Sequence, residues 1–107
     1  MNKDKLLIEL NKSKSILKLQ NVNLKISNIE NKYIDIEYVG KINITFHLVF
    51  KNDNFYHFEL DTFFDDVYYY ILNFFNLKSA LCINNDILQT ISINKLIQCI
   101  FSLEYIK

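Results

Sequence analysis

The sequence predicts one α+β domain in which a four-stranded antiparallel meander is combined with three helices. Two observations predict this class. Apolar and polar residues alternate strictly over four runs in the first part of the chain, and helical spacing is found before residue 20 and after residue 61. A period of two is typical of half-buried strands, and a three-to-four spacing is typical of amphipathic helices. Because 107 residues is a common size for one domain, we expect a single core over residues 1–107.

The first predicted element is an N-terminal helix over residues 4–19. Its apolar residues form a partial stripe that is interrupted between Asn11 and Ser15, and lysines cover much of the remaining surface. A partial stripe of this kind is enough to bury one side of a short helix.

The four alternating runs predict strands at about 21–29, 33–39, 41–50 and 54–60. The breaks between them are short, so we expect consecutive hairpins and a sheet with one solvent-exposed face. The residues expected to face the core all carry even numbers, and each hairpin must therefore pair even with even. Three-residue loops at 39–41 and 51–53 satisfy this condition, and Gly40 would then supply a positive φ.

A Phe/Tyr-rich helix is predicted at about 62–76, where it would cover the apolar face of the sheet. Asp61 or Thr62 can cap it, and Thr62 with Asp65 resembles a capping box. A C-terminal helix is predicted at about 92–105, with Ser92 as its cap. Between these helices, Ile87 to Ile91 fit either a short strand or the start of a helix, so the structure of residues 80–91 is left open.

The composition excludes several kinds of site. All twelve basic residues are lysine, the formal net charge is zero, and Gly40 is the single glycine. A Gly-rich phosphate loop therefore cannot form, and sequence-specific nucleic-acid binding is not expected without arginine or a basic excess. We find no secretory signal and no run of about 18 apolar residues, so we expect a cytoplasmic protein without a membrane partner. The abundance of Asn, Ile, Lys, Tyr and Phe indicates a low-GC genome.

The histidines and cysteines are the candidates for chemistry. If the last hairpin has a three-residue loop, His47 faces His57 on the exposed side and, with Glu59, becomes a candidate metal site. A Cys–His nucleophile would need Cys82 or Cys99 beside one of these histidines. Cys99 lies among apolar residues that indicate burial, and a buried thiol is inert. We therefore assign no catalytic residue and no cofactor.

The acids and the surplus aromatic residues are the better signal. Residues 33–66 carry two lysines and seven acids, whereas residues 1–32 carry seven lysines and three acids. Tyrosines away from the core stripe are typical of protein interfaces. The predicted protein-binding residues are Asp35, Glu37, Glu59, Asp61, Asp65, Asp66, Tyr69 and Tyr70.

These features favour a non-enzymatic protein-binding module. In size, low-GC composition and element order, the chain resembles small phage-encoded inhibitors, including some anti-CRISPR proteins, although no motif transfers a residue role. The resemblance implies a larger host protein or protein–nucleic acid complex as partner, inside the host cell, with the acids imitating phosphates. The alternatives are a toxin-neutralising immunity protein, a small metal- or Cys-dependent hydrolase, and a self-assembling subunit such as a homodimer.

Overall fold

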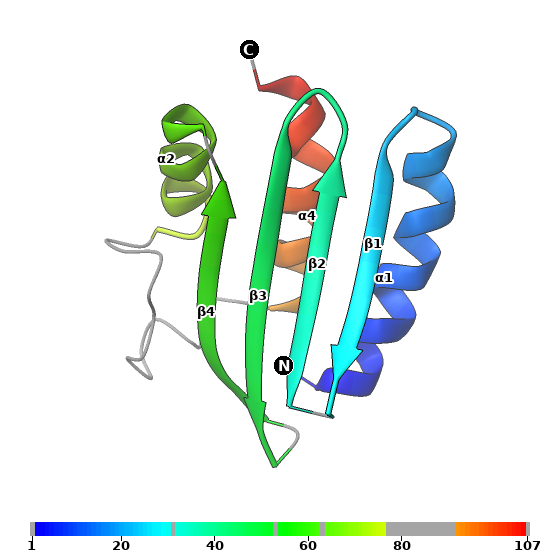
Figure 1. Ribbon diagram of the computed structural model, residues 1–107, viewed down its shortest axis with the longest axis vertical. Helices are drawn as coiled ribbons and strands as arrows, with labels where there is room; N and C mark the ends of the chain where they lie inside the picture. Colours follow the sequence, from blue (N-terminus) through cyan, green and yellow to red (C-terminus); the bar gives the residue numbers. More distant parts are fainter. Residues whose placement is uncertain (1, 31, 53, 63, 77–91, 107) are drawn as a thin grey trace.

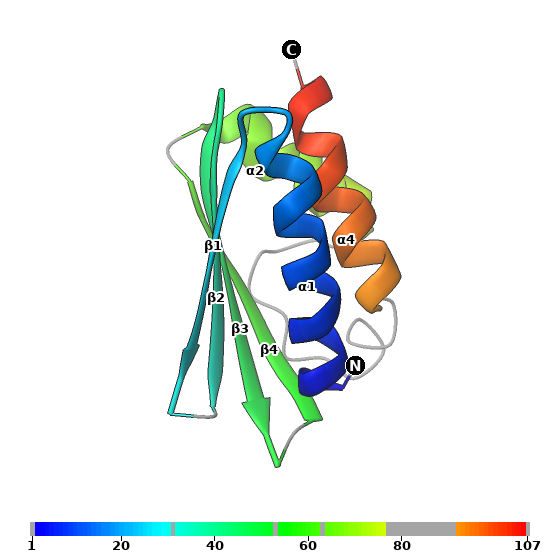
Figure 2. The same cartoon turned by 90° about the vertical axis from the view of Figure 1, so that its right-hand side faces the viewer.

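The chain folds into a four-stranded antiparallel sheet with helices packed on one of its faces (Figures 1 and 2). The structure is a computed structural model that describes residues 2–30, 32–52, 54–62, 64–76 and 92–106. The predicted α+β class and the meander order β1-β2-β3-β4 are confirmed. The elements are α1 (Lys3–Lys18), β1 (Asn23–Ile29), β2 (Tyr33–Val39), β3 (Asn43–Lys51), β4 (Asn54–Thr62), α2 (Asp65–Phe74), α4 (Ile93–Ser102) and the 3₁₀ turn η1 (Leu103–Tyr105).

The even-numbered side of the sheet faces the helices, as the alternation predicts. Its central residue, Phe46, is fully buried, and its cross-strand neighbours are Ile36 on β2 and Leu60 on β4. Burying a large apolar side chain stabilises a fold by about 1.5–3 kcal/mol, so these inward rows supply much of the driving force. The other described residues that are buried on this side of the sheet are Leu24, Ile34, Tyr38, Ile44, Leu48 and Phe50.

Helix α1 covers β1, and its interrupted stripe has a physical explanation. Leu6, Leu10 and Leu17 are fully buried, and Ser13 occupies the core-facing position between the last two. The Ser13 hydroxyl donates to the Glu9 carbonyl oxygen at 2.8 Å, which satisfies this polar group inside the core layer. The helix is capped by Asn2, whose side-chain oxygen accepts from the Lys5 amide.

The two later helices divide the rest of the apolar face between them. Helix α4 lies behind the middle of the sheet and contacts α1, whereas α2 lies beside β4 near the end of that strand (Figures 1 and 2). The Tyr70 hydroxyl of α2 donates to Ser102 Oγ of α4 at 2.7 Å and joins the two helices. Ser92 caps α4, as predicted, by accepting from the Lys95 amide. The open question about residues 80–91 lies outside the described residues.

The predicted capping box at the start of α2 is wrong. Strand β4 continues through Thr62, which pairs with Ile44, and the Thr62 hydroxyl donates to the Asn43 carbonyl oxygen at 3.2 Å. That hydroxyl also accepts from the Phe64 amide, so both of these hydrogen bonds are made at the end of the sheet, before the helix begins. The helix begins at Asp65, and its cap, Phe64, makes no side-chain capping bond. Asp65 and Asp66 do lie in the first turn, as predicted.

Two of the predicted hairpin loops are displaced, although the pairing of even with even residues holds along the body of the sheet. Val39 pairs with Asn43, so the loop is 40–42 rather than 39–41. Gly40 does not have a positive φ; instead, a Cβ there would lie 3.3 Å from Tyr38 Cε1. In the last hairpin Lys51 pairs with Asn54, which places an odd-numbered residue opposite an even-numbered one. A bulge opposite Val49 and Phe50 then restores the pairing of even with even residues along the rest of the two strands.

Candidate functional site: the open face of the sheet

Apart from Phe55, which packs against the core beside the bulge, the odd-numbered side chains of the described sheet point away from the helices. In the described part of the chain, no helix lies on this side (Figure 2). We call this surface the open face and define it by the side chains of Lys25, Ser27, Tyr33, Asp35, Glu37, Thr45, His47, Glu59 and Asp61. These residues are half-buried or exposed. A half-solvated antiparallel sheet of this kind presents its side chains at fixed spacings.

The strand register arranges the open face in rows across the sheet. One row runs from Ser27 through Asp35 and His47 to Glu59, each residue directly opposite the next. The adjacent row runs from Lys25 through Glu37 and Thr45 to Asp61. Two carboxylates therefore lie on β2 and two on β4, and the strand between them carries a threonine and a histidine.

His47 is held in place at the centre of this surface. Its Nδ1 atom lies in hydrogen-bond contact with Asp35 Oδ1. The imidazole stacks on the Tyr33 ring, with 5.3 Å between the ring centroids and an interplanar angle of 26°. Both the histidine and the aspartate keep about a third of their side chains exposed. The pair is therefore an ordered polar feature of a solvated surface.

The predicted opposition of His47 and His57 is wrong. The bulge in the last hairpin places Glu59 opposite His47, and His57 lies opposite Val49. For the same reason, Thr45 faces Asp61. The side chain of His57 is outside the described part of the structure. Among the described residues, no group of three or more His, Cys, Asp or Glu side chains is arranged to hold a metal ion.

Cys99 is fully buried in α4, as the sequence predicts. Burial raises the pKa of its thiol from 9.0 to about 12, because the apolar surroundings disfavour the thiolate. A thiol that stays protonated and is closed off from solvent does not act as a nucleophile. Cys82, the other candidate, lies outside the described residues.

The predicted protein-binding residues separate into three groups. Asp35, Glu37, Glu59 and Asp61 come together on the open face. Asp65 and Asp66 are exposed at the start of α2, and Tyr69 on the same helix is 62% exposed. Tyr70 is half-buried and its hydroxyl bonds Ser102 of α4, while its ring lies near Phe74 of its own helix, so it belongs to the packing between helices.

Thr45 was not predicted as part of the site, although it belongs to the open face. The sequence contains the signal for it in the odd-numbered phase of its strand. The register was needed to show that Thr45 lies between Glu37 and Asp61 and that Tyr33 stacks on His47.

No protein-family model, curated protein or solved structure matches the chain. None of the helices in the described ranges has the length and apolar character needed to cross a bilayer.

Proposed function

We propose that this chain is a non-enzymatic protein-binding module of the phage or mobile-element type, which acts inside the host cell by inhibiting a larger protein. The open face would be its binding surface. The observation that carries the proposal is the placement of Asp35, Glu37, Glu59 and Asp61 together on the side of the sheet that no described helix covers. A surface of this charge fits a partner with a basic groove.

The spacing of the carboxylates suits a groove that normally holds nucleic acid. Asp35 and Glu37 form one acidic line on β2, and Glu59 and Asp61 form a second line on β4. Since one strand separates them, the lines are roughly 10 Å apart, twice the distance between neighbouring strands. The major groove of DNA, bounded by two phosphate backbones, is about 12 Å wide. Two parallel lines of carboxylates can therefore occupy a channel that normally binds the two phosphate backbones.

The rigidity of the sheet favours such binding. Each carboxylate is attached to a strand that is hydrogen-bonded to its neighbours, so little backbone freedom is lost when a partner docks. The contact between His47 and Asp35 and the stacked Tyr33 order the centre of the surface in the same way. Acids fixed in this arrangement would also steer a basic partner toward the open face.

A triple variant with a matched control tests the proposal. Glu37→Gln, Glu59→Gln and Asp61→Asn remove three charges from the open face and leave the Asp35–His47 contact intact. The control, Asp4→Asn, Glu9→Gln and Glu30→Gln, removes the same kinds of charge from α1 and the first hairpin. Each variant is immobilised and exposed to lysate of the host cell, and retained proteins are identified by mass spectrometry. A partner held by the wild type and the control, and lost by the open-face variant, is the expected result.

The identified partner is then measured directly. At about 0.2–1 kcal/mol for each exposed charge pair, the loss of three charges should make the open-face variant bind it roughly threefold to a hundredfold more weakly. Nucleic acid should compete with the chain for the partner. Equal affinity of the two triple variants would contradict the assignment of the open face, and simultaneous binding of chain and nucleic acid would contradict phosphate mimicry.

A further inference from the structure

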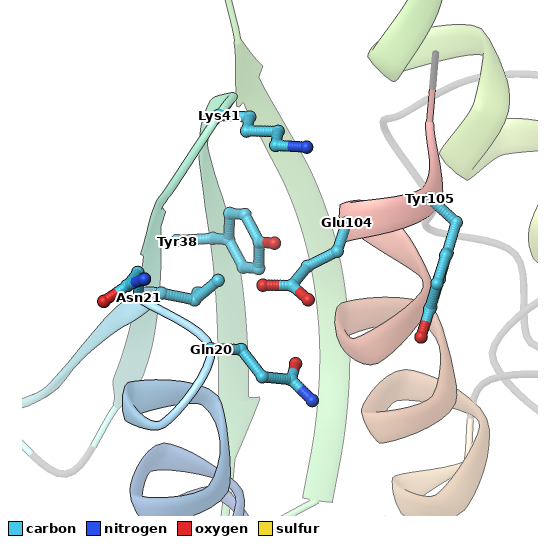
Figure 3. Close-up of a pocket in the computed structure, with 7 residues that line it drawn as sticks. Gln20, Asn21, Tyr38, Lys41, Glu104 and Tyr105 are labelled. Atoms are coloured by element: carbon cyan, nitrogen blue, oxygen red, sulfur yellow. The ribbon is translucent and has the colours of Figure 1, made fainter.

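A pocket of about 450 Å³ lies at one end of the molecule, on the helix side of the sheet (Figure 3). Three segments that are distant in the sequence form it. Gln20 comes from the turn after α1, Tyr38 and Lys41 come from β2 and the hairpin that follows it, and Glu104 and Tyr105 come from η1. Because Tyr38 is on the core side of the sheet, the pocket is separate from the open face.

The floor of the pocket is fixed by tight packing. Tyr38 is 1% exposed and Val22 is 4% exposed. A Cβ at Gly40 would lie 3.3 Å from Tyr38 Cε1 and 3.4 Å from Val22 Cγ2, so the hairpin backbone is pressed against both side chains. The ring of Tyr38 is thus held, and its hydroxyl points toward the carboxylate of Glu104 (Figure 3).

The lining carries one charge of each sign. The ammonium of Lys41 stands on the rim on one side, and the carboxylate of Glu104 projects into the pocket from the other side (Figure 3). Among the described residues, no ion pair within 4.0 Å involves either group. Burial and then the nearby Glu104 raise the pKa of Tyr38 to about 12, so its hydroxyl keeps its proton and can donate. The amide of Gln20 adds a further donor and acceptor.

We propose that this pocket binds a small zwitterion of the α-amino acid type, with its ammonium group at Glu104 and its carboxylate at Lys41. A ligand with one charge would satisfy one of these side chains and leave the other unmatched, whereas a zwitterion satisfies both. The volume lies within the range of about 300–1,000 Å³ that is usual for small-molecule sites. The Tyr38 hydroxyl and the Gln20 amide supply the uncharged polar contacts.

Amide chemical shifts of the ¹⁵N-labelled chain test the proposal. The free common α-amino acids are titrated one at a time, and the one that binds most tightly is compared with the amine and the carboxylic acid that share its side chain. Saturable shifts are expected at Gly40, Lys41, Glu104 and Tyr105. Because charge-assisted contacts are lost, each single-charge analogue should bind roughly tenfold more weakly or worse.

Matched substitutions assign the two charges. Lys41→Met and Glu104→Gln should each weaken binding of the amino acid by roughly tenfold. Lys25→Met and Glu37→Gln make the same changes on the open face and should leave the affinity unchanged. Lys41 is exposed on a hairpin, so its variant should keep the native spectrum elsewhere. The proposal is overturned if no amino acid gives saturable shifts at these amides, if a single-charge analogue binds as tightly, or if Lys41→Met binds like the wild type.

Discussion

The ionisation of Tyr38 provides a quantitative test of how closely the end of the fold is packed. Its pKa is raised from 10.0 to about 12, first by burial and second by Glu104. A change of this size corresponds to about 3 kcal/mol between the neutral and ionised forms. The folded chain then binds the phenolic proton more tightly than the unfolded chain does. The contribution of Tyr38 to the free energy of unfolding is therefore fully present below pH 10 and is lost as the pH rises toward 12.

Two measurements follow Tyr38 separately from the other tyrosines. In the ¹³Cζ-tyrosine NMR spectrum, its resonance should titrate at about 12. Urea denaturation should show that the free energy of unfolding falls more steeply above pH 10 in the wild type than in Tyr38→Phe, by an amount approaching about 3 kcal/mol. Glu104→Gln should lower the pKa of Tyr38 but leave it above 10.0, because burial is the larger cause. Titration of Tyr38 at its ordinary value of 10.0 would refute the close packing of this end of the fold.

Three further predictions concern the core and a turn. Phe46→Ala at the centre of the sheet should lower the free energy of unfolding by about 3–5 kcal/mol, and a loss under about 1 kcal/mol in urea denaturation would contradict its central position. In a Cys82→Ser background, Cys99 should be alkylated by iodoacetamide only as the chain unfolds, so rapid labelling of the native protein would disagree with its burial. Asn52 has a φ of 52°; Asn52→Val should therefore cost about 1–2 kcal/mol in thermal unfolding, whereas Asn52→Gly should cost nothing, and equal losses would disprove strain at this turn.

The strands could be predicted from the sequence because alternation constrains them strongly. A slip of one residue would turn Ile36 and Phe46 toward solvent, so the parity of every hairpin is determined by burial. Parity does not distinguish registers that differ by two residues. The observed registers are accompanied by contacts that alternation does not encode. The Thr62 hydroxyl donates to the carbonyl oxygen of Asn43 on the neighbouring strand, and Gly40 closely approaches the Tyr38 ring within its own hairpin. Because alternation is the same with or without these contacts, both loop predictions were displaced.

The same distinction applies to the candidate sites. The acids of β2 and β4 could be assigned to one face from their odd numbers, and the structure places them there. Their cross-strand neighbours could not be assigned, because the bulge before His57 moves every later residue of β4 relative to β3. The end pocket had no sequence signal at all, since Tyr38 and Glu104 meet only when η1 reaches the sheet. Similarly, Tyr70 carries no local sign that its hydroxyl bonds Ser102.

The zero net charge of the chain conceals a separation of charge across the sheet, and this separation bears on the proposed function. Several lysines are exposed on α1, on the helix side, whereas the open face as defined carries four carboxylates and one lysine, Lys25. A helix packs on a sheet at a distance of about 10 Å, similar to the spacing of stacked sheets, and salt screens charges over about 8 Å at physiological ionic strength. A partner at the open face therefore responds mainly to the carboxylates, and the lysines behind the sheet contribute little. A neutral protein can thus present an acidic surface to a basic groove, and neutralising acids of α1 or the first hairpin should leave that interaction almost unchanged.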